Sequence, residues 1–294
     1  MKVGFIGLGR MGQGMAGRLI DAGHDLLVSD PVPGQTTKLE AAGAIAVDSA
    51  VATTAGRDVV ISMLPSDKVL DIVLNGDNGL ISGMDSSCIH MAMGTHGVKA
   101  INAATTANAE AGLTFIASPV LGRPDLAAQG LLKVVPGGPT DAVDKVIPLL
   151  EIIGQTTFRV GESQQAAAAV KVTNNFVLGC AIETMGEALS LVEKLGVEPQ
   201  LFFEVMTQGL FAAPAYDVYG KMIVEQNWDS FGATAIIGLK DDDLALEAAE
   251  VAEVPLPSTH IWRDYLQSAI DRGEGALDWA VMAREQARAS GLDK

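Results

Sequence analysis

Short runs of hydrophobic residues alternate with glycine-rich or polar segments over the first half of the chain, a pattern typical of buried strands between helices. The runs predict strands at Lys2–Ile6, Asp25–Ser29, Ala44–Ala46, Val59–Ser62, Cys88–Met91, Thr114–Ser118, Leu131–Val135 and Thr156–Val160. The segments between them predict helices at Met11–Ala22, Ser49–Ala55, Ser66–Leu74, Gly97–Ala111 and Thr140–Ile153. This alternation predicts an α/β domain over residues 1–162, with a mainly parallel, doubly wound sheet.

Beyond Gly161 the strand pattern stops and the rest of the chain looks helical. The expected helices are Gln164–Leu195, Pro199–Gln208, Ala213–Glu225, Thr234–Val254, Ser258–Arg272 and Asp278–Ser290. No linker rich in proline and serine divides the halves, so the first of these helices joins an all-α domain, residues 163–294, directly to the α/β domain. At about 1.5 Å per residue it would span some ~45 Å, more than a small domain needs. We therefore predict that a second subunit covers it, in a homodimer or tetramer formed through the C-terminal helices.

Lys171 is the only charged side chain between Glu162 and Glu183, in an alanine-rich helix that is apolar around most of its circumference. Desolvation lowers the pKa of a lysine toward the range in which it can exchange a proton during a reaction. Asn175, one turn further on, can act as its polar partner. On these residues alone, a lysine that reaches the surface along its stem is an equally good interpretation.

The N-terminus carries a dinucleotide-binding motif. Gly7-Leu-Gly-Arg-Met-Gly12 follows the first strand at once and opens a helix, which is the setting that a G-x-G-x-x-G motif requires. Such glycines allow a tight turn, bring the backbone close to a pyrophosphate and let helix and strand pack closely. The α/β domain is therefore predicted to be of the Rossmann type. Its expected cofactor-binding residues include Gly7, Leu8, Gly9, Arg10, Met11 and Gly12.

Asp30 ends the second predicted strand, at the offset where an acidic residue binds the adenosine ribose hydroxyls. A carboxylate there accepts hydrogen bonds from both hydroxyls of NAD and repels the extra phosphate of NADP. The residues that follow, Pro31-Val-Pro-Gly34, offer no arginine for that phosphate. The sequence thus favours NAD, although an ordinary aspartate that caps a turn is the alternative.

Composition narrows the class of protein. A formal net charge of −16 over 294 residues excludes a basic face for nucleic acid. Two cysteines, Cys88 and Cys180, are too few for a disulfide framework, and the four histidines lack metal-ligand spacing, so we expect no metal. The sequence shows no signal peptide and no run of about 18 apolar residues that suggests a membrane span. We expect a cytoplasmic enzyme.

Five markers in order resemble the β-hydroxyacid dehydrogenase family, which includes 3-hydroxyisobutyrate dehydrogenase, tartronate semialdehyde reductase and the glyoxylate/succinic semialdehyde reductases. They are Gly4-Phe-Ile-Gly-Leu-Gly-Arg-Met-Gly12 with Ala22-Gly-His24, Ile61-Ser-Met-Leu-Pro65, Ser118-Pro-Val-Leu-Gly122 with Gly130, Lys171-Val-Thr-Asn-Asn175 with Glu187-Ala-Leu189, and Phe231 with Leu239-Lys-Asp241. The resemblance runs over almost the whole chain. It implies a C-terminal domain like that of 6-phosphogluconate dehydrogenase, and a reaction that interconverts a 3-hydroxyacid and its semialdehyde or ketone.

The resemblance also implies roles for single residues. Lys171 would be the general acid/base, and Asn175 would orient it or hold the substrate. Lys240 would close over the cofactor and the anionic end of the substrate. The residues expected beside the cofactor or substrate in other loops are Met63, Leu64, Pro65, Thr95 and Gly122.

Two departures from the family pattern alter the expected substrate pocket. Where the family has a serine and two glycines after Pro-Val, this chain reads Leu121-Gly122-Arg123, and Arg123 either grips a carboxylate in bidentate fashion or points to solvent. Where the family has Ser-Thr-x-Ser/Asp-Pro, the chain reads Gly94-Thr95-His96-Gly97. His96 is therefore either an extra proton donor or substrate contact, or a loop histidine without such a role. An unusual semialdehyde, a bulkier 3-hydroxyacid or a less polar carbonyl compound is expected.

Two other functions compete. Imine-reducing relatives share this architecture but usually replace the lysine with aspartate or tyrosine, so Lys171 counts against imine reduction. A cofactor-binding scaffold without activity would have lost the lysine.

Overall fold

The structure is a computed structural model that describes residues 1–229 and 232–292, so that Phe231 of the predicted C-terminal marker lies outside the described residues. The chain forms two compact units, Met1–Lys171 and Val172–Lys294.

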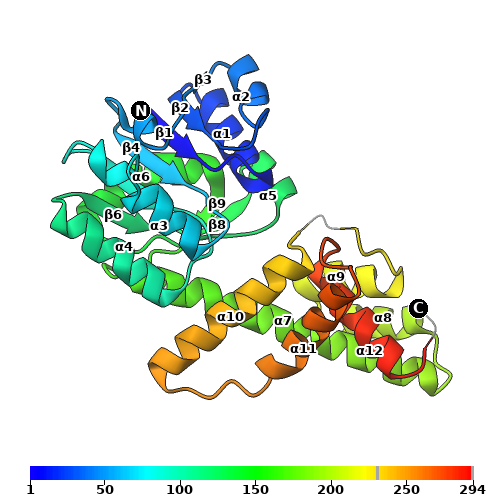
Figure 1. Cartoon of the computed structure of the whole chain (residues 1–294). Coiled ribbons are helices and arrows are strands. Elements are labelled where there is room, and N and C mark those ends of the chain that lie inside the picture. Colours follow the sequence, from blue (N-terminus) through cyan, green and yellow to red (C-terminus); the bar gives the residue numbers. More distant parts are fainter. Residues whose placement is uncertain (230–231, 293–294) are drawn as a thin grey trace. The chain divides into compact units, whose positions relative to one another are not determined.

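The first unit is built on a six-stranded sheet in the order β3-β2-β1-β4-β5-β6 (Figure 1). Every neighbouring pair of strands is parallel. The strands are β1 (Lys2–Ile6), β2 (Asp25–Ser29), β3 (Ile45–Ala46), β4 (Val59–Ser62), β5 (Ile89–Ala92) and β6 (Thr114–Ala117). The strand order reverses between β1 and β4, the point where open parallel sheets bind ligands beyond their carboxyl ends. The predicted Rossmann-type architecture is confirmed.

A second, three-stranded sheet was only partly anticipated. It contains β7 (Val120–Leu121), β8 (Leu132–Val134) and β9 (Gly154–Thr157), with β7 antiparallel to β8. The prediction missed β7 because two residues ending at a glycine give no readable alternation. It also placed β9 too late, at Thr156–Val160, because Gly154 and Gln155 carry no strand-forming side chains.

Helices surround the sheets as expected, with differences in the shortest elements. The helices are α1 (Arg10–Asp21), α2 (Thr37–Ala41), α3 (Asp67–Asn75), α4 (Val98–Glu110), α5 (Pro124–Gln129) and α6 (Thr140–Ile153), with 3₁₀ turns η1 (Val51–Thr54) and η2 (Leu80–Ser82). The predicted helix Ser49–Ala55 is the 3₁₀ turn η1. Both α2 and α5 were missed, since one or two turns contain too few residues to show a helical period.

The central strands of the large sheet are buried on both faces, whereas the edge strand β3 is exposed. Phe5 and Ile61 are completely buried, and the whole of β4 and β5 is buried residue by residue. Strands covered by helices on both sides need continuous apolar runs, which explains why these were the clearest signals in the sequence.

The second unit is entirely helical in its described residues, which confirms the expected all-α architecture. A long helix, α7 (Gln164–Lys194), leads into it, followed by α8 (Pro199–Gln208), α9 (Pro214–Val224), α10 (Ala235–Ala252), α11 (Thr259–Asp271), η3 (Trp279–Val281) and α12 (Met282–Ala289). Its core holds Trp262 and Trp279, with ring centroids 6.3 Å apart in an edge-to-face arrangement. Gly179 of α7 lies against the Trp262 ring, where a Cβ would come within 2.8 Å of it.

By length and composition alone, α7 meets the usual criterion for a membrane span, with a mean hydropathy of 1.2 over its best window. The sequence analysis had found no apolar run long enough to suggest a membrane span. The criterion is weak evidence, because the core helix of a globular protein passes it too. Here α7 supplies Ile182, Met185 and Leu189 to the core of the second unit.

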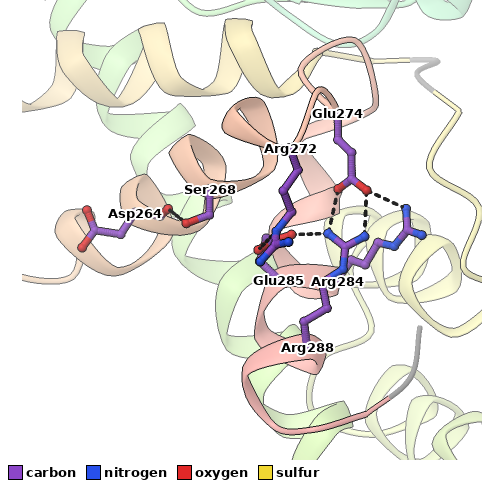
Figure 2. Close-up of polar contacts among 7 residues, drawn as sticks. All are labelled: Asp264, Ser268, Arg272, Glu274, Arg284, Glu285 and Arg288. Carbon is purple, nitrogen blue, oxygen red and sulfur yellow. Dashed lines mark hydrogen bonds and ion pairs between the residues drawn. The ribbon is translucent and has the colours of Figure 1, made fainter.

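Arginine–glutamate pairs join α12 to the segment that precedes it (Figure 2). Nη1 of Arg284 and Nη2 of Arg288 lie 3.1 Å and 2.7 Å from Oε1 of Glu274. Nε of Arg272 lies 3.1 Å from Oε2 of Glu285, which also forms an ion pair with Arg288. The hydrogen bond from Arg288 lowers the pKa of Glu274. Three arginines shared by two carboxylates form a network, which stabilises the C-terminus more than isolated surface pairs do.

Asp242 on α10 is a buried carboxyl without hydrogen bonds. Its side chain is 0% exposed, and neither oxygen has a hydrogen-bond partner among the described residues; its one ion pair, to Arg263 Nε, is long at 3.5 Å. Burial raises its pKa to about 7, and the nearby carboxylates of Asp243 and Asp264 add to the rise against the opposing charge of Arg263.

An Asp242→Asn variant should therefore be more stable than the parent at pH 8, by roughly 1–3 kcal/mol. Because the folded state holds the Asp242 proton more tightly than the unfolded state, the parent loses stability as pH rises from about 4 to about 7. The gain should accordingly shrink toward pH 4. Thermal unfolding at both pH values measures it, with Asp48→Asn, at an exposed aspartate of the first unit, as control. An equal gain at both pH values would contradict the buried ionisation.

Candidate functional site

The loop after β1 is shaped by Gly7 and Gly12, which leave no room for a side chain. Gly7 has a φ of +88°, and a Cβ there would lie 2.3 Å from the carbonyl oxygen of Met63. A Cβ on Gly12 would lie 2.0 Å from the carbonyl oxygen of Gly7. A Cβ on Gly9, by contrast, would meet nothing within 4 Å. The first and third glycines thus serve packing, and the second leaves its backbone open.

The N-terminus of α1 offers a site for an anion. Gly9 is its N-cap and has no side chain to accept from the first-turn N–H groups, and no acidic residue lies in that turn. Arg10, the first residue of the helix, is exposed. Uncapped N–H groups at the positive end of a helix dipole suit a pyrophosphate. The donor set and the open backbone at Gly9 therefore fit a dinucleotide.

Asp30, directly after β2, is tied to this loop. Its Oδ2 accepts a hydrogen bond from the backbone N–H of Leu8 at 2.7 Å, and its Oδ1 accepts one from Val32 at 2.8 Å. The carboxylate that was predicted to hold the adenosine ribose thus lies against the glycine loop, as that role requires.

The loops after β4 and β5 extend the same edge of the sheet. Leu64 is buried and Pro65 exposed in the first loop, and Thr95 is half-buried in the second. A Cβ on Gly94 would lie 2.6 Å from the carbonyl oxygen of Leu64, so the two loops touch backbone to backbone. The structure thereby brings together the predicted residues of four loops, those after β1, β2, β4 and β5.

His96 is buried, with only 2% of its surface exposed. Its Nδ1 lies 2.9 Å from Oδ1 of Asp67, the first residue of α3. It belongs to the lining of a narrow cavity, together with Ala92, Gly94, Ile101, Ala117, Pro119 and Ala168. His96 is therefore a buried loop histidine whose Nδ1 is engaged by Asp67, and its contact with the substrate stays a prediction.

Lys171 lies on α7 and is half-buried. Ala168, three residues before it on the same helix, lines the narrow cavity beside Gly94 and His96. The start of α7 therefore runs along the loop that carries Thr95, and the lysine follows one turn later.

Within the second unit, Asn175 and Lys240 share one aspartate. The side-chain amide of Asn175 donates to Oδ2 of Asp241 at 2.6 Å, and Nζ of Lys240 lies 2.9 Å from Oδ1 of the same carboxylate. Asn175 and Asp241 are both buried. Asp241 thus fixes two residues that the family resemblance assigned to the site.

Arg123 is engaged by its own chain. Its Nε and Nη2 donate to the two carboxylate oxygens of Asp125, at 3.2 and 3.0 Å. The hydrogen bond from Arg123 lowers the pKa of Asp125. Gly122 is exposed, with a φ of +138°. The bidentate grip foreseen for Arg123 exists, but its partner is Asp125.

Sequence reasoning gave no role to Asp67 and Asp241, which hold His96 and Asn175. Sequence features could have indicated such partners, because a buried polar side chain needs a hydrogen-bond partner, and an aspartate at a helix start is a common one.

Among the other histidines, His90 is fully buried, with Nε2 3.0 Å from the hydroxyl of Ser62. Burial lowers the pKa of His90 to about 3. Among the described residues no group of three or more His, Cys, Asp or Glu side chains could hold a metal ion.

Known proteins resemble this chain over nearly its whole length. Residues 2–161 match the sequence profile of the NAD-binding domain of 6-phosphogluconate dehydrogenase, and residues 166–285 match that of the NAD-binding domain of NADP-dependent 3-hydroxyisobutyrate dehydrogenase. The uncharacterized oxidoreductase YfjR of Bacillus subtilis is 37% identical over 284 residues, which cover 97% of this chain and 99% of that protein. The 3-hydroxyisobutyrate dehydrogenase of Pseudomonas aeruginosa is 31% identical, with 96% and 97% covered.

The fold is shared with solved structures. The solved structure of Mycobacterium tuberculosis 3-hydroxyisobutyrate dehydrogenase with L-serine superposes with a TM-score of 0.87. The two sequences are 25% identical, and the match covers 96% of this chain and 98% of the solved one. Solved imine reductases share the fold at lower TM-scores.

The glycine loop makes a paired prediction. Gly9→Ala should keep the melting temperature of the parent, because its methyl group meets no protein atom. The same variant should weaken NADH binding by roughly tenfold or more, because the methyl group would stand where the pyrophosphate is expected to approach. Gly12→Ala should lower the melting temperature, because its methyl group would overlap the Gly7 carbonyl. Thermal unfolding without cofactor and titration with NADH measure both. Unchanged NADH affinity in folded Gly9→Ala would contradict the assignment.

Proposed function

The chain belongs to the β-hydroxyacid dehydrogenase family, and from this premise we propose that it transfers hydride between NAD and a small 3-hydroxyacid, with Lys171 as the general acid/base. That the chain is an NAD(P)-linked oxidoreductase follows from the family. One observation supports the proposed role of Lys171. The lysine lies one helical turn after Ala168, and Ala168 lines a cavity together with Gly94 and His96, the two neighbours of Thr95 in the chain.

Lys171 acts at the reacting oxygen. In carbonyl reduction its ammonium donates a proton to the oxygen, and in alcohol oxidation its neutral amine takes the hydroxyl proton. The nicotinamide, when bound, accepts or supplies the hydride. From the family resemblance, Asn175 is proposed to orient Lys171 or hold the substrate, and Lys240 to close over the cofactor and the anionic end of the substrate. Within the second unit, Asp241 holds both side chains.

NAD is the proposed cofactor in preference to NADP. The support is Asp30, whose carboxylate is held against Leu8 and is followed by Pro31-Val-Pro-Gly34 without an arginine. A fixed negative charge at the adenosine ribose opposes the extra phosphate of NADP.

The substrate differs from that of the usual family pattern. Leu121 replaces a hydroxyl with an aliphatic side chain, and the Arg123 guanidinium is already paired with Asp125. Both changes favour a bulkier or less polar carbonyl compound than 3-hydroxyisobutyrate semialdehyde.

Residues 163–294 are proposed to supply the substrate side of the site and the contacts of a homodimer or tetramer. We further propose a cytoplasmic location. Imine reduction is not favoured, because Lys171 occupies the position where those relatives usually have aspartate or tyrosine.

Lys171→Ala should lower kcat by a factor on the order of 10²–10⁴, while the NADH dissociation constant stays unchanged, because the variant loses proton transfer alone. The substrate comes first from a screen of hydroxyacids and semialdehydes that follows NADH absorbance. Lys194→Ala, an exposed lysine in the last turn of the same helix, is the matched control. Full turnover in the Lys171 variant would disprove the assignment.

Asp30→Asn should raise kcat/KM for NADPH relative to NADH by roughly tenfold or more, since it removes the charge and keeps an acceptor for one backbone N–H. The parent should prefer NADH, as measured with both cofactors at one saturating substrate concentration. A parent that prefers NADPH would overturn the proposed role of Asp30.

A further inference from the structure

We propose that His96, held by Asp67, is a positioning residue that clamps the loop after β5 onto the loop after β4. The two loops carry Thr95 and Leu64, so the clamp holds both in place for the cofactor. The inference rests on the proposed function, because it assigns these loops to the nicotinamide half of the cofactor.

One carboxylate makes the connection. Oδ1 of Asp67 lies 2.9 Å from Nδ1 of His96, and both its oxygens accept from the backbone N–H of Gly97 at 3.2 Å. Asp67 is the first residue of α3, and Gly97 is the N-cap of α4. A carboxylate between two helix N-termini is favoured by both helix dipoles, so Asp67 is a strong acceptor at this junction.

The imidazole uses one nitrogen for this bond and buries the other. Since the Asp67 carboxylate only accepts, Nδ1 is the donor in this bond. Nε2 has no hydrogen-bond partner among the described residues, and the cavity beside it has no room for a water molecule. The bond that positions the loop is therefore made by Nδ1, and the rest of the ring fills space.

Gly94 shows how closely the clamp draws the loops together. A Cβ at this position would stand 2.6 Å from Nε2 of His96 and 2.6 Å from the carbonyl oxygen of Leu64. The ring takes the room that a side chain at position 94 would need. Gly94 and His96 are thus complementary in space, and together they fix the backbone on either side of Thr95.

The test uses the full chain with three substitutions at one position. In His96→Asn the amide nitrogen can replace Nδ1, in His96→Gln it falls nearer to Nε2, and His96→Val keeps neither donor. NADH affinity is measured by fluorescence titration, and KM for NADH and kcat are measured with the best substrate. We expect His96→Gln and His96→Val to raise the NADH dissociation constant and KM by about tenfold with kcat little changed, as for a lost charge-assisted hydrogen bond, and His96→Asn to stay within about threefold of the parent.

Other outcomes decide against the clamp. If His96→Gln binds NADH like the parent while His96→Asn does not, Nε2 is the working atom and the proposal is wrong. Unchanged affinity in all three variants also overturns it. If the parent itself binds no NADH, the proposed function fails. The clamp is then tested separately by the rate of amide hydrogen exchange at residues 93–97. Faster exchange in His96→Val and Asp67→Asn than in His96→Asn supports the clamp, and equal exchange refutes it.

Discussion

The whole site depends on backbone meeting backbone where the parallel strands end. At Gly7 and Gly94 the chain passes so close to the carbonyl oxygens of Met63 and Leu64 that no side chain fits. These contacts set the spacing of the loops after β1, β4 and β5, at the point where the strand order reverses. A crevice of backbone atoms held at fixed spacing can follow the cofactor closely, because no flexible side chain intervenes.

Acidic side chains then fix what the glycines bring together. Asp30 ties the end of β2 to the glycine loop through Leu8, and Asp67 ties α3 to the loop after β5 through His96. In the second unit Asp241 holds Asn175 and Lys240. Each of these carboxylates fixes a neighbour whose geometry matters more than its own, as expected of a site built from a supporting shell.

Much of this was predictable from the sequence, and what was missed has a physical pattern. The central strands of the large sheet are buried on both faces, so their apolar runs gave nearly correct bounds. The glycine motif marked the start of α1 within one residue. The two-residue strand β7 and the short helices α2 and α5 escaped, because their structure is imposed by packing; α5, for example, lies so close to α1 that a Cβ on Gly14 would come within 2.7 Å of Ala128 N. Arg123 and His96 were found as candidates, but their partners, Asp125 and Asp67, depend on chain geometry that spacing cannot reveal.

Electrostatics links these partners to the choice of substrate. The chain carries a formal net charge of −16, so an anionic substrate approaches against the field of the whole protein and needs local positive charge. Yet Arg123 is paired with Asp125, and Lys240 with Asp241, each at about hydrogen-bond distance. A carboxylate substrate would have to compete with these aspartates for the same guanidinium and ammonium groups. Under the proposed function, a substrate with less charge would avoid that competition, and Leu121 would offer it an aliphatic side chain where the family pattern has a serine.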